Sequence, residues 1–94
     1  MRISFNEQVE GGRVVRSYGR VCAATTWHAP GAPCARGDWK AEALRALVGA
    51  AEDFEADALI DVAYEVDGVV ASDLGAFPLQ RVMATGVAVK LARA

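Results

Sequence analysis

The sequence predicts an α+β fold, a β-α-β-β unit in which one helix packs on a three-stranded antiparallel sheet. Three observations predict this fold. Over 12–24, small side chains nearly alternate with a second set that includes two arginines and a tyrosine. Apolar residues recur at helical spacing after Asp38. Further alternating stretches occupy 58–67 and 80–91. The chain has 94 residues, about the size of one small domain, so we expect a single domain over 1–94.

The first expected strand, 12–24, has two different faces. Small side chains gather on one of them, which carries Val15, Ser17, Gly19, Val21 and Ala23. The other face carries Val14, Arg16, Tyr18, Arg20 and Cys22. Small side chains let another element approach closely, so we expect the helix to cover the first face.

A loop and a helix follow this strand. The stretch 25–37 contains two Pro and two Gly, which break any periodic element. Asp38 is a suitable N-cap, because its carboxylate can accept from free N–H groups in the first helical turn. We expect a helix from Trp39 to about Glu55. Its expected core face is Leu44, Leu47, Val48, Ala51 and Phe54.

Two strands complete the expected sheet. The stretch from Ala58 to Asp67 alternates cleanly. The dipeptide Asp67-Gly68 is typical of a hairpin turn, so Val69 to Ala71 should turn back before an irregular stretch over 72–78. The last strand runs from Gln80 to Leu91.

The last strand carries apolar side chains on both faces. One helix can cover only one face of a three-stranded sheet, so the second face needs another cover. We therefore expect a homo-oligomer. The alternative is that Ala and Gly on the second face are simply tolerated in contact with water.

Composition restricts the function classes. The formal net charge is −2, which argues against nucleic acid or an anionic membrane as a partner. We expect no membrane span, because the longest apolar stretch, Ala46 to Ala51, is far shorter than the roughly 20 residues required. The first seven residues lack an apolar signal core, and two cysteines are too few for a disulfide scaffold, so we expect a cytoplasmic protein.

Three stretches resemble one family. The segments EGGRVVRSYGRV, EADALIDVAYEVDG and ATGVAVK, in this order, resemble the YbjQ-like family of small uncharacterised bacterial proteins, which are proposed to bind heavy metals. The resemblance covers about half of the chain. It implies a dodecin-like subunit and a homo-oligomeric ring, most often a pentamer, built by strand and helix contacts between neighbours.

The chain also departs from this family. Family members carry a longer Gly-rich and Arg-rich segment ahead of the helix, where this chain has the loop 25–37. They also place Gly before the Ala-Asp pair, where this chain has Glu55. Either Glu55 adopts a left-handed conformation, at roughly 1 kcal/mol, or the helix ends differently.

The chain holds two cysteines and one histidine, at six-residue intervals: Cys22, His28 and Cys34. Thiolate and imidazole suit a soft divalent metal such as zinc or copper. Structural zinc sites usually pair ligands two to four residues apart, and here three ligands stand singly with no obvious fourth. Across a ring, neighbouring subunits could supply the missing ligands. A disulfide between the cysteines in oxidised protein, or ordinary thiols without a function, are the alternatives.

A second candidate site lies on the first strand. Arg16, Tyr18 and Arg20 share a predicted face and could hold an anion or a planar ligand. Pairing of these arginines with acidic residues across strands is the simpler interpretation. Trp27 and Trp39 flank the loop and could stack on a flavin-like ring by analogy with dodecins, or could cover the core.

Catalytic templates are absent from the sequence. We find no nucleophile elbow, phosphate-binding Gly loop or HExxH motif, so we expect no enzyme. The expected function is binding of a soft metal ion or small ligand at subunit interfaces. The alternative is a non-catalytic structural or protein-interaction scaffold.

Overall fold

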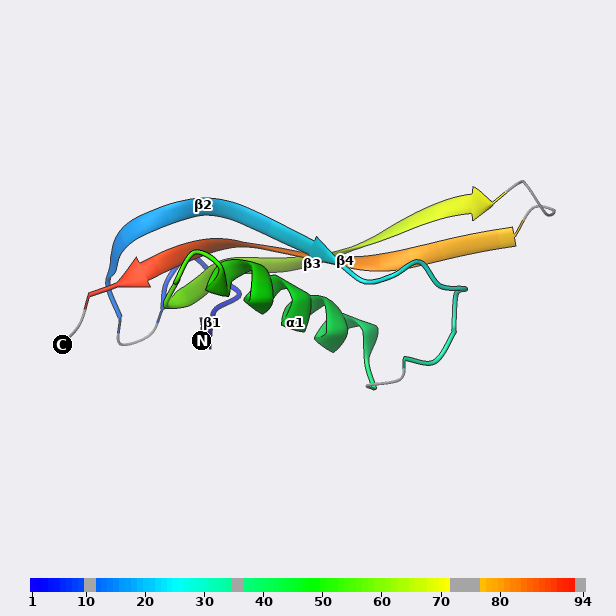
Figure 1. Ribbon diagram of the computed structural model, residues 1–94, viewed down its shortest axis with the longest axis horizontal. Helices are drawn as coiled ribbons and strands as arrows, with labels where there is room; N and C mark the ends of the chain where they lie inside the picture. The colour runs from blue at the N-terminus through cyan, green and yellow to red at the C-terminus, as the bar shows by residue number, and fades with distance from the viewer. Residues whose placement is uncertain (10–11, 35–36, 72–76, 93–94) are drawn as a thin grey trace.

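The computed structural model describes residues 1–9, 12–34, 37–71 and 77–92. Its elements are β1 (Arg2–Ile3), β2 (Val14–Ala24), α1 (Trp39–Glu52), β3 (Ala58–Ala71) and β4 (Phe77–Leu91). The four strands form one sheet in the order β1-β3-β4-β2. The helix lies along one face of this sheet (Figure 1).

The α+β class is confirmed, but the predicted three-stranded antiparallel sheet is wrong. The sheet has four strands and is mixed, because β1 pairs parallel with β3 while β2 and β3 flank β4 antiparallel. Backbone bonds hold β1: Ser4 N donates to the Leu59 carbonyl at 2.8 Å, and Val62 N donates to the Ser4 carbonyl at 3.1 Å. A strand of two residues is too short to show the alternation on which the sequence prediction relied.

A bulge changes the faces of β2. Gly19 has φ +97°, and the pairing with β4 shifts between Ser17 and Gly19. This extra residue puts Tyr18 on the helix side together with Val21 and Ala23, all packed against the core beneath α1. The strict alternation expected for this strand is therefore wrong before Gly19.

The helix begins where the sequence predicts. Asp38 Oδ1 accepts a hydrogen bond from Lys40 N at 2.9 Å. The helix ends at Glu52 rather than near Glu55, and Glu55 itself has φ 57°. Phe54 therefore lies beyond the helix and is 49 % exposed instead of facing the core.

Small side chains on β4 let the helix approach closely. The core between the helix and the sheet consists of Ala43, Leu47, Ala51, Leu59, Val62, Val82, Ala84 and Ala88. Gly86 is also buried here: a Cβ atom would lie 3.2 Å from Val62 Cγ2 and 3.3 Å from the Ile60 carbonyl oxygen. The small face that supports the helix thus comes largely from β4, not from β2 alone as expected.

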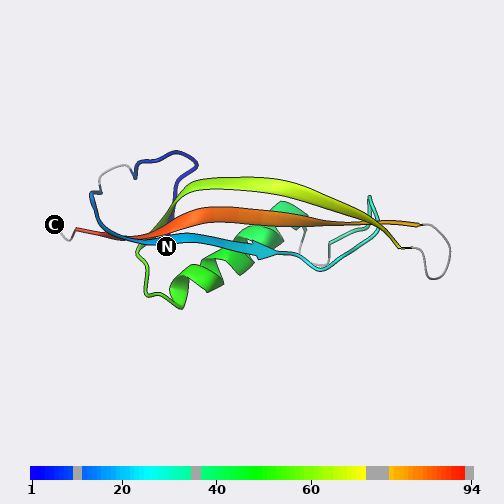
Figure 2. The same ribbon diagram turned by 90° about the horizontal axis from the view of Figure 1, so that it is seen from above.

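The N-terminal segment covers part of the opposite face of the sheet (Figure 2). Val9 packs there with Ala58, Val89 and Leu91. The two-sided apolar pattern of the last strand is thus partly accounted for within one chain. At Val89 and Leu91 it does not require a second subunit.

The hairpin of β3 and β4 extends well past the helix (Figure 1). The turn predicted at Asp67-Gly68 is wrong, because these residues continue β3 and pair with Arg81 and Gln80. Of the irregular stretch expected over 72–78, the part at 72–76 lies outside the described residues. We call 66–71 together with 77–81 the hairpin arm. The described molecule is accordingly elongated, at 56 × 23 × 21 Å.

Within the described ranges, no helix is long and apolar enough to cross a membrane.

Candidate functional site

The loop after β2 stays attached to β4 before it reaches the helix. Thr25 N donates to the Val82 carbonyl at 2.9 Å, and Val82 N donates back to Thr25 Oγ1 at 3.0 Å. Further along, His28 and Gln80 exchange two backbone hydrogen bonds, at 2.9 and 2.7 Å. The loop is therefore held against β4 by ladder-like pairing, although its described residues form no regular strand.

His28 and Trp39 form the centre of this region. Their rings are stacked, with centroids 3.7 Å apart and planes 3° apart. The indole N–H of Trp39 donates to the Ala32 carbonyl at 2.8 Å. Trp39 is the first residue of α1, so these contacts fix the helix N-terminus to two points of the loop.

The buried imidazole of His28 has one partnered and one unpartnered nitrogen. Nδ1 lies 3.0 Å from the Thr26 carbonyl oxygen. Because a carbonyl can only accept, this contact assigns the proton to Nδ1 and leaves a lone pair on Nε2 in the neutral ring. Among the described residues, Nε2 is the one buried side-chain nitrogen or oxygen without a hydrogen-bond partner. Such groups are rare in folded proteins.

A cleft of about 290 Å³ lies between the loop and the helix. Its walls are formed by Ala24, Thr25, Thr26, Cys34, Trp39, Glu42 and Ala46. It thus combines an aromatic ring, a thiol, a carboxylate and hydroxyl groups on an otherwise apolar wall. This size lies at the lower end of the range for small-molecule sites.

The three residues predicted to bind metal lie in different settings. Cys22 is exposed on β2, His28 is buried against Trp39, and Cys34 is half-buried at the cleft. Both thiols are free. Across 1–9, 12–34, 37–71 and 77–92, no three His, Cys, Asp or Glu side chains gather as a metal-holding group. A site completed by neighbouring subunits stays a prediction.

The candidate anion site on β2 is divided between the two faces of the sheet. Tyr18 packs on the helix side, stacks on Phe54 at 6.1 Å and lies 5.2 Å from the Arg16 guanidinium. Arg20 pairs in register with Val87, which belongs to the opposite face, and its Nη2 lies 3.1 Å from Asp61 Oδ2. The bulge at Gly19 causes this separation. The expected cross-strand ion pairing of an arginine is confirmed for Arg20.

The two tryptophans do not share one platform. Trp39 stacks on His28, while Trp27 has the Arg81 guanidinium 4.6 Å from its ring centroid. Arg81 is also paired with Asp67 on the hairpin arm, with 3.2 Å between Nη2 and Oδ2. Trp27 thereby packs against the arm, and the flavin hypothesis stays a prediction.

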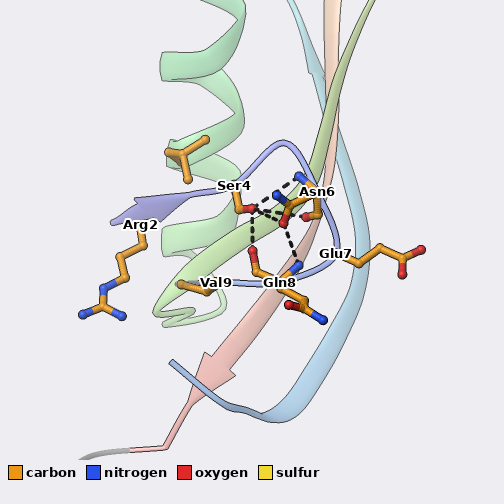
Figure 3. A pocket seen from close by; sticks show the side chains of 7 residues that line it. Arg2, Ser4, Asn6, Glu7, Gln8 and Val9 are labelled. Carbon is orange, nitrogen blue, oxygen red and sulfur yellow. Dashed lines mark hydrogen bonds between the residues drawn. The ribbon is translucent and has the colours of Figure 1, made fainter. Parts of the chain in front are cut away.

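A larger hollow, of about 870 Å³, lies along the N-terminal segment (Figure 3). Two of its polar side chains, Ser4 and Asn6, form hydrogen bonds within the segment itself. Ser4 Oγ donates to the Gln8 carbonyl at 2.6 Å, and Asn6 Oδ1 accepts from Gln8 N at 2.9 Å (Figure 3). These bonds are typical of an Asx-type turn, so we interpret the hollow as the inside of a structural loop. The smaller cleft is chemically richer and is our candidate site.

Sequence reasoning found part of this cleft and missed the rest. It singled out Cys34 in the loop and Trp39, which flanks the loop. Glu42 lies outside the core face that the helical spacing predicts, and that spacing does not reveal that a loop lies over the first turn of the helix. The proximity of Thr25 to β4 leaves no signal in the sequence.

The fold is similar to one from a family of unknown function. No family model matches the chain, and no curated protein matches it. Among solved structures, the chain is similar to the crystal structure of a protein of unknown function from Pediococcus pentosaceus, which belongs to the DUF74 family. The two chains are 19 % identical over 98 % of each, with a TM-score of 0.64. This similarity shows a shared fold and gives no information about activity.

Proposed function

We propose that this protein is a non-enzymatic, cytoplasmic protein that assembles into a homo-oligomeric ring of the YbjQ-like kind and binds a soft metal ion or small ligand between subunits. The observation that carries the proposal is the hairpin arm. Val66 and Val69 on this arm are 61 % and 47 % exposed. Within the described residues, the loop contacts the arm at Gln80 and Arg81, and no helix covers it. A two-stranded hairpin with so little support is marginally stable in water, so we expect a second copy of the chain to cover it.

The open edges of the sheet support the same assembly. β2 is an outer strand of 11 residues. The other outer edge belongs largely to β3, because β1 pairs only with Ala58 and Leu59. Unpaired edges attract further strands. Two different edges that meet form a head-to-tail contact, which closes into a ring when the rotation between subunits allows.

The ligand part of the proposal rests on residues that face outward. Cys22 is exposed on the edge strand, where a neighbouring subunit would lie. Free thiols suit a reducing cytoplasm and a soft metal ion. The alternative is a structural or protein-interaction scaffold, in which both thiols are incidental.

Native mass spectrometry of untagged protein, purified without chelator, tests the proposal. We expect a whole-number multiple of the 9.9 kDa subunit mass, with five subunits as the expected number. A stoichiometric excess mass would support ligand binding, whereas a bare ring would favour the scaffold. Val66→Glu with Val69→Glu should dissociate the ring, while Glu65→Gln on the same strand should not. A wild-type monomer at micromolar concentration would contradict the assembly.

A further inference from the structure

The two strands with open edges carry opposite charges. β2 contains Arg16 and Arg20 and no acidic residue. β3 contains no basic residue and three acidic ones, Asp61, Glu65 and Asp67. Arg20 pairs with Asp61 and Asp67 with Arg81 inside the chain, so among the described residues Arg16 and Glu65 keep no ion-pair partner. Like charges opposite each other destabilise strand pairing, so β2 of one copy suits β3 of another better than either strand suits its own copy.

The N-terminal segment leaves only the arm end of the β3 edge open. β1 pairs in parallel with Ala58 and Leu59, and Val62 N donates to the Ser4 carbonyl at 3.1 Å. Within the described residues, no strand pairs with this edge from Ala63 onward. A strand added there would lie in line with β1, and the 11 residues of β2 are enough to cover the open part.

The outward backbone groups of β3 belong to residues whose side chains lie on the helix face. Val62 N points outward to Ser4, and successive residues of a strand point their N–H groups to alternate sides. The N–H groups of Tyr64 and Val66 therefore also point outward. Val62 and Tyr64 pack on the core beneath α1, and Val66 pairs with Val82 of the same core.

The outward backbone groups of β2 belong to the opposite face. Thr25 N donates inward to β4, so the N–H group of Cys22, three residues earlier, points outward. Cys22 stands between Val21 and Ala23, which both pack beneath the helix, so its side chain lies on the other face. In a parallel pair, each residue bonds to the two neighbours of the residue beside it. Bonding residues thus come from opposite faces of the two strands, and the edges of β2 and β3 meet this requirement when both helices share a face.

The position of the helix favours the same arrangement. α1 packs on β2 and β4 and only marginally on β3. Val66 is 61 % exposed on the helix face of β3. When β2 of a neighbour lies beside this part of β3, the helix above that β2 comes next to Val66. Two β3 edges that met would leave Val66 of both copies without a helix.

We propose that β2 of one copy pairs in parallel with β3 of the next copy, from Ala63 onward, with both helices on one face of a continuous sheet. This joint depends on the proposed ring and specifies which surfaces close it. β2 and β3 run parallel to each other, because each is antiparallel to β4. Rotation about an axis along the strands keeps their direction, so a cyclic ring joins them in parallel.

Disulfide cross-linking from Cys22 tests this joint. The background variant is Cys34→Ser, which leaves Cys22 as the only thiol. A second cysteine is placed on β3, on the face that carries Cys22, at one position per variant: Ala63→Cys, Glu65→Cys, Asp67→Cys or Val69→Cys. A disulfide forms only where two Cα atoms come within about 7 Å. After air oxidation with a copper phenanthroline catalyst, we expect at least one variant to give covalent multimers larger than a dimer on a non-reducing gel.

Two controls accompany these variants. Val66→Cys lies on the same strand, but its side chain is on the helix face, so it should give no such multimers. Addition of Cys22→Ser to the variant that cross-links should abolish the multimers. Native mass spectrometry of each reduced variant shows whether it still assembles, so a loss of assembly is not mistaken for a different joint.

Four results would overturn the proposed joint. Dimers of the Cys34→Ser background, linked through Cys22 of both copies, would mean that two β2 edges meet. Dimers that form without Cys22 would mean that two β3 edges meet. A wild-type ring with no cross-link from any of the four positions would mean that other surfaces close it, and the proposed function would stand. A wild-type monomer in native mass spectrometry would remove the ring and the joint together.

Discussion

The imidazole of His28 lies parallel to the indole of Trp39, with 3.7 Å between the ring centroids. The two residues are eleven positions apart, on the loop and at the first position of α1. The same imidazole donates from Nδ1 to the Thr26 carbonyl. The His28 side chain therefore connects the loop to the start of the helix, in addition to the backbone pairing of the loop with β4.

Substitution of His28 by alanine should destabilise the protein by about 1–3 kcal/mol. The change removes an aromatic stack and a buried hydrogen bond together. Urea unfolding at fixed protein concentration measures the loss. Thr26→Ala is the matched control, since it keeps the backbone carbonyl that accepts from His28 and should change stability by less than about 0.5 kcal/mol. Equal stability of His28→Ala and wild type would show that the stack does not hold the loop.

Glu55 occupies a left-handed conformation, with φ 57°. Glycine adopts this region without a steric penalty, so Glu55→Gly should stabilise the protein by about 0.5–1 kcal/mol. For a domain of this size, the expected rise in Tm is about 2–8 °C. Glu52→Gly, three residues earlier at the last position of the helix, should lower Tm, because glycine is a poor helix former. A lower Tm for Glu55→Gly would contradict the strain argument.

Gly86 allows β3 and β4 to pack without a side chain between them. A methyl group there would meet Val62 Cγ2 at 3.2 Å and the Ile60 carbonyl oxygen at 3.3 Å. Gly86→Ala should therefore destabilise the protein by about 1–3 kcal/mol, measured by thermal unfolding. Gly49→Ala has open space around its new methyl group and lies within α1, so it should stabilise by roughly 0.5–1 kcal/mol. If Gly86→Ala and Gly49→Ala changed Tm in the same direction and by the same amount, the result would contradict close packing at Gly86.

The sequence predicted those features of the fold that depend on residues close together in the chain. The start of α1 follows from the Asp38 cap. The single alternation expected over 58–67 is wrong, because the pairing of β3 with β4 shifts between Ile60 and Ala63. Ala58 and Ile60 pack with Val89 on the opposite face, whereas Val62 and Tyr64 pack on the helix side. The prediction of a turn at Asp67-Gly68 is wrong, because pairing of these residues with Arg81 and Gln80 outweighs the preference of the dipeptide for a turn. The ends of long strands are set by such partners, which a single sequence does not identify.

The candidate site was harder to predict for a related reason. Cys34 and Trp39 could be singled out, since both lie in or beside an irregular loop. The assignment of Glu42 to the cleft depends on where that loop folds, and the loop position depends on pairing of His28 with Gln80. The bulge at Gly19 likewise separates Tyr18 from Arg20, although strict alternation places them together.

Removal of both thiols tests the metal part of the proposed function. We expect the reduced protein to retain zinc or copper after gel filtration, and Cys22→Ser with Cys34→Ser to lose it, as measured by elemental analysis per subunit. His28→Gln should also lower retention if the Nε2 lone pair is a ligand, whereas retention in Asp61→Asn should be unchanged because Asp61 is paired with Arg20. The described part of the chain gathers no three donors into one metal-holding group, so retention should depend on assembly and fall in Val66→Glu with Val69→Glu. Equal metal content in wild type and the double cysteine variant would leave the scaffold as the better account of this protein.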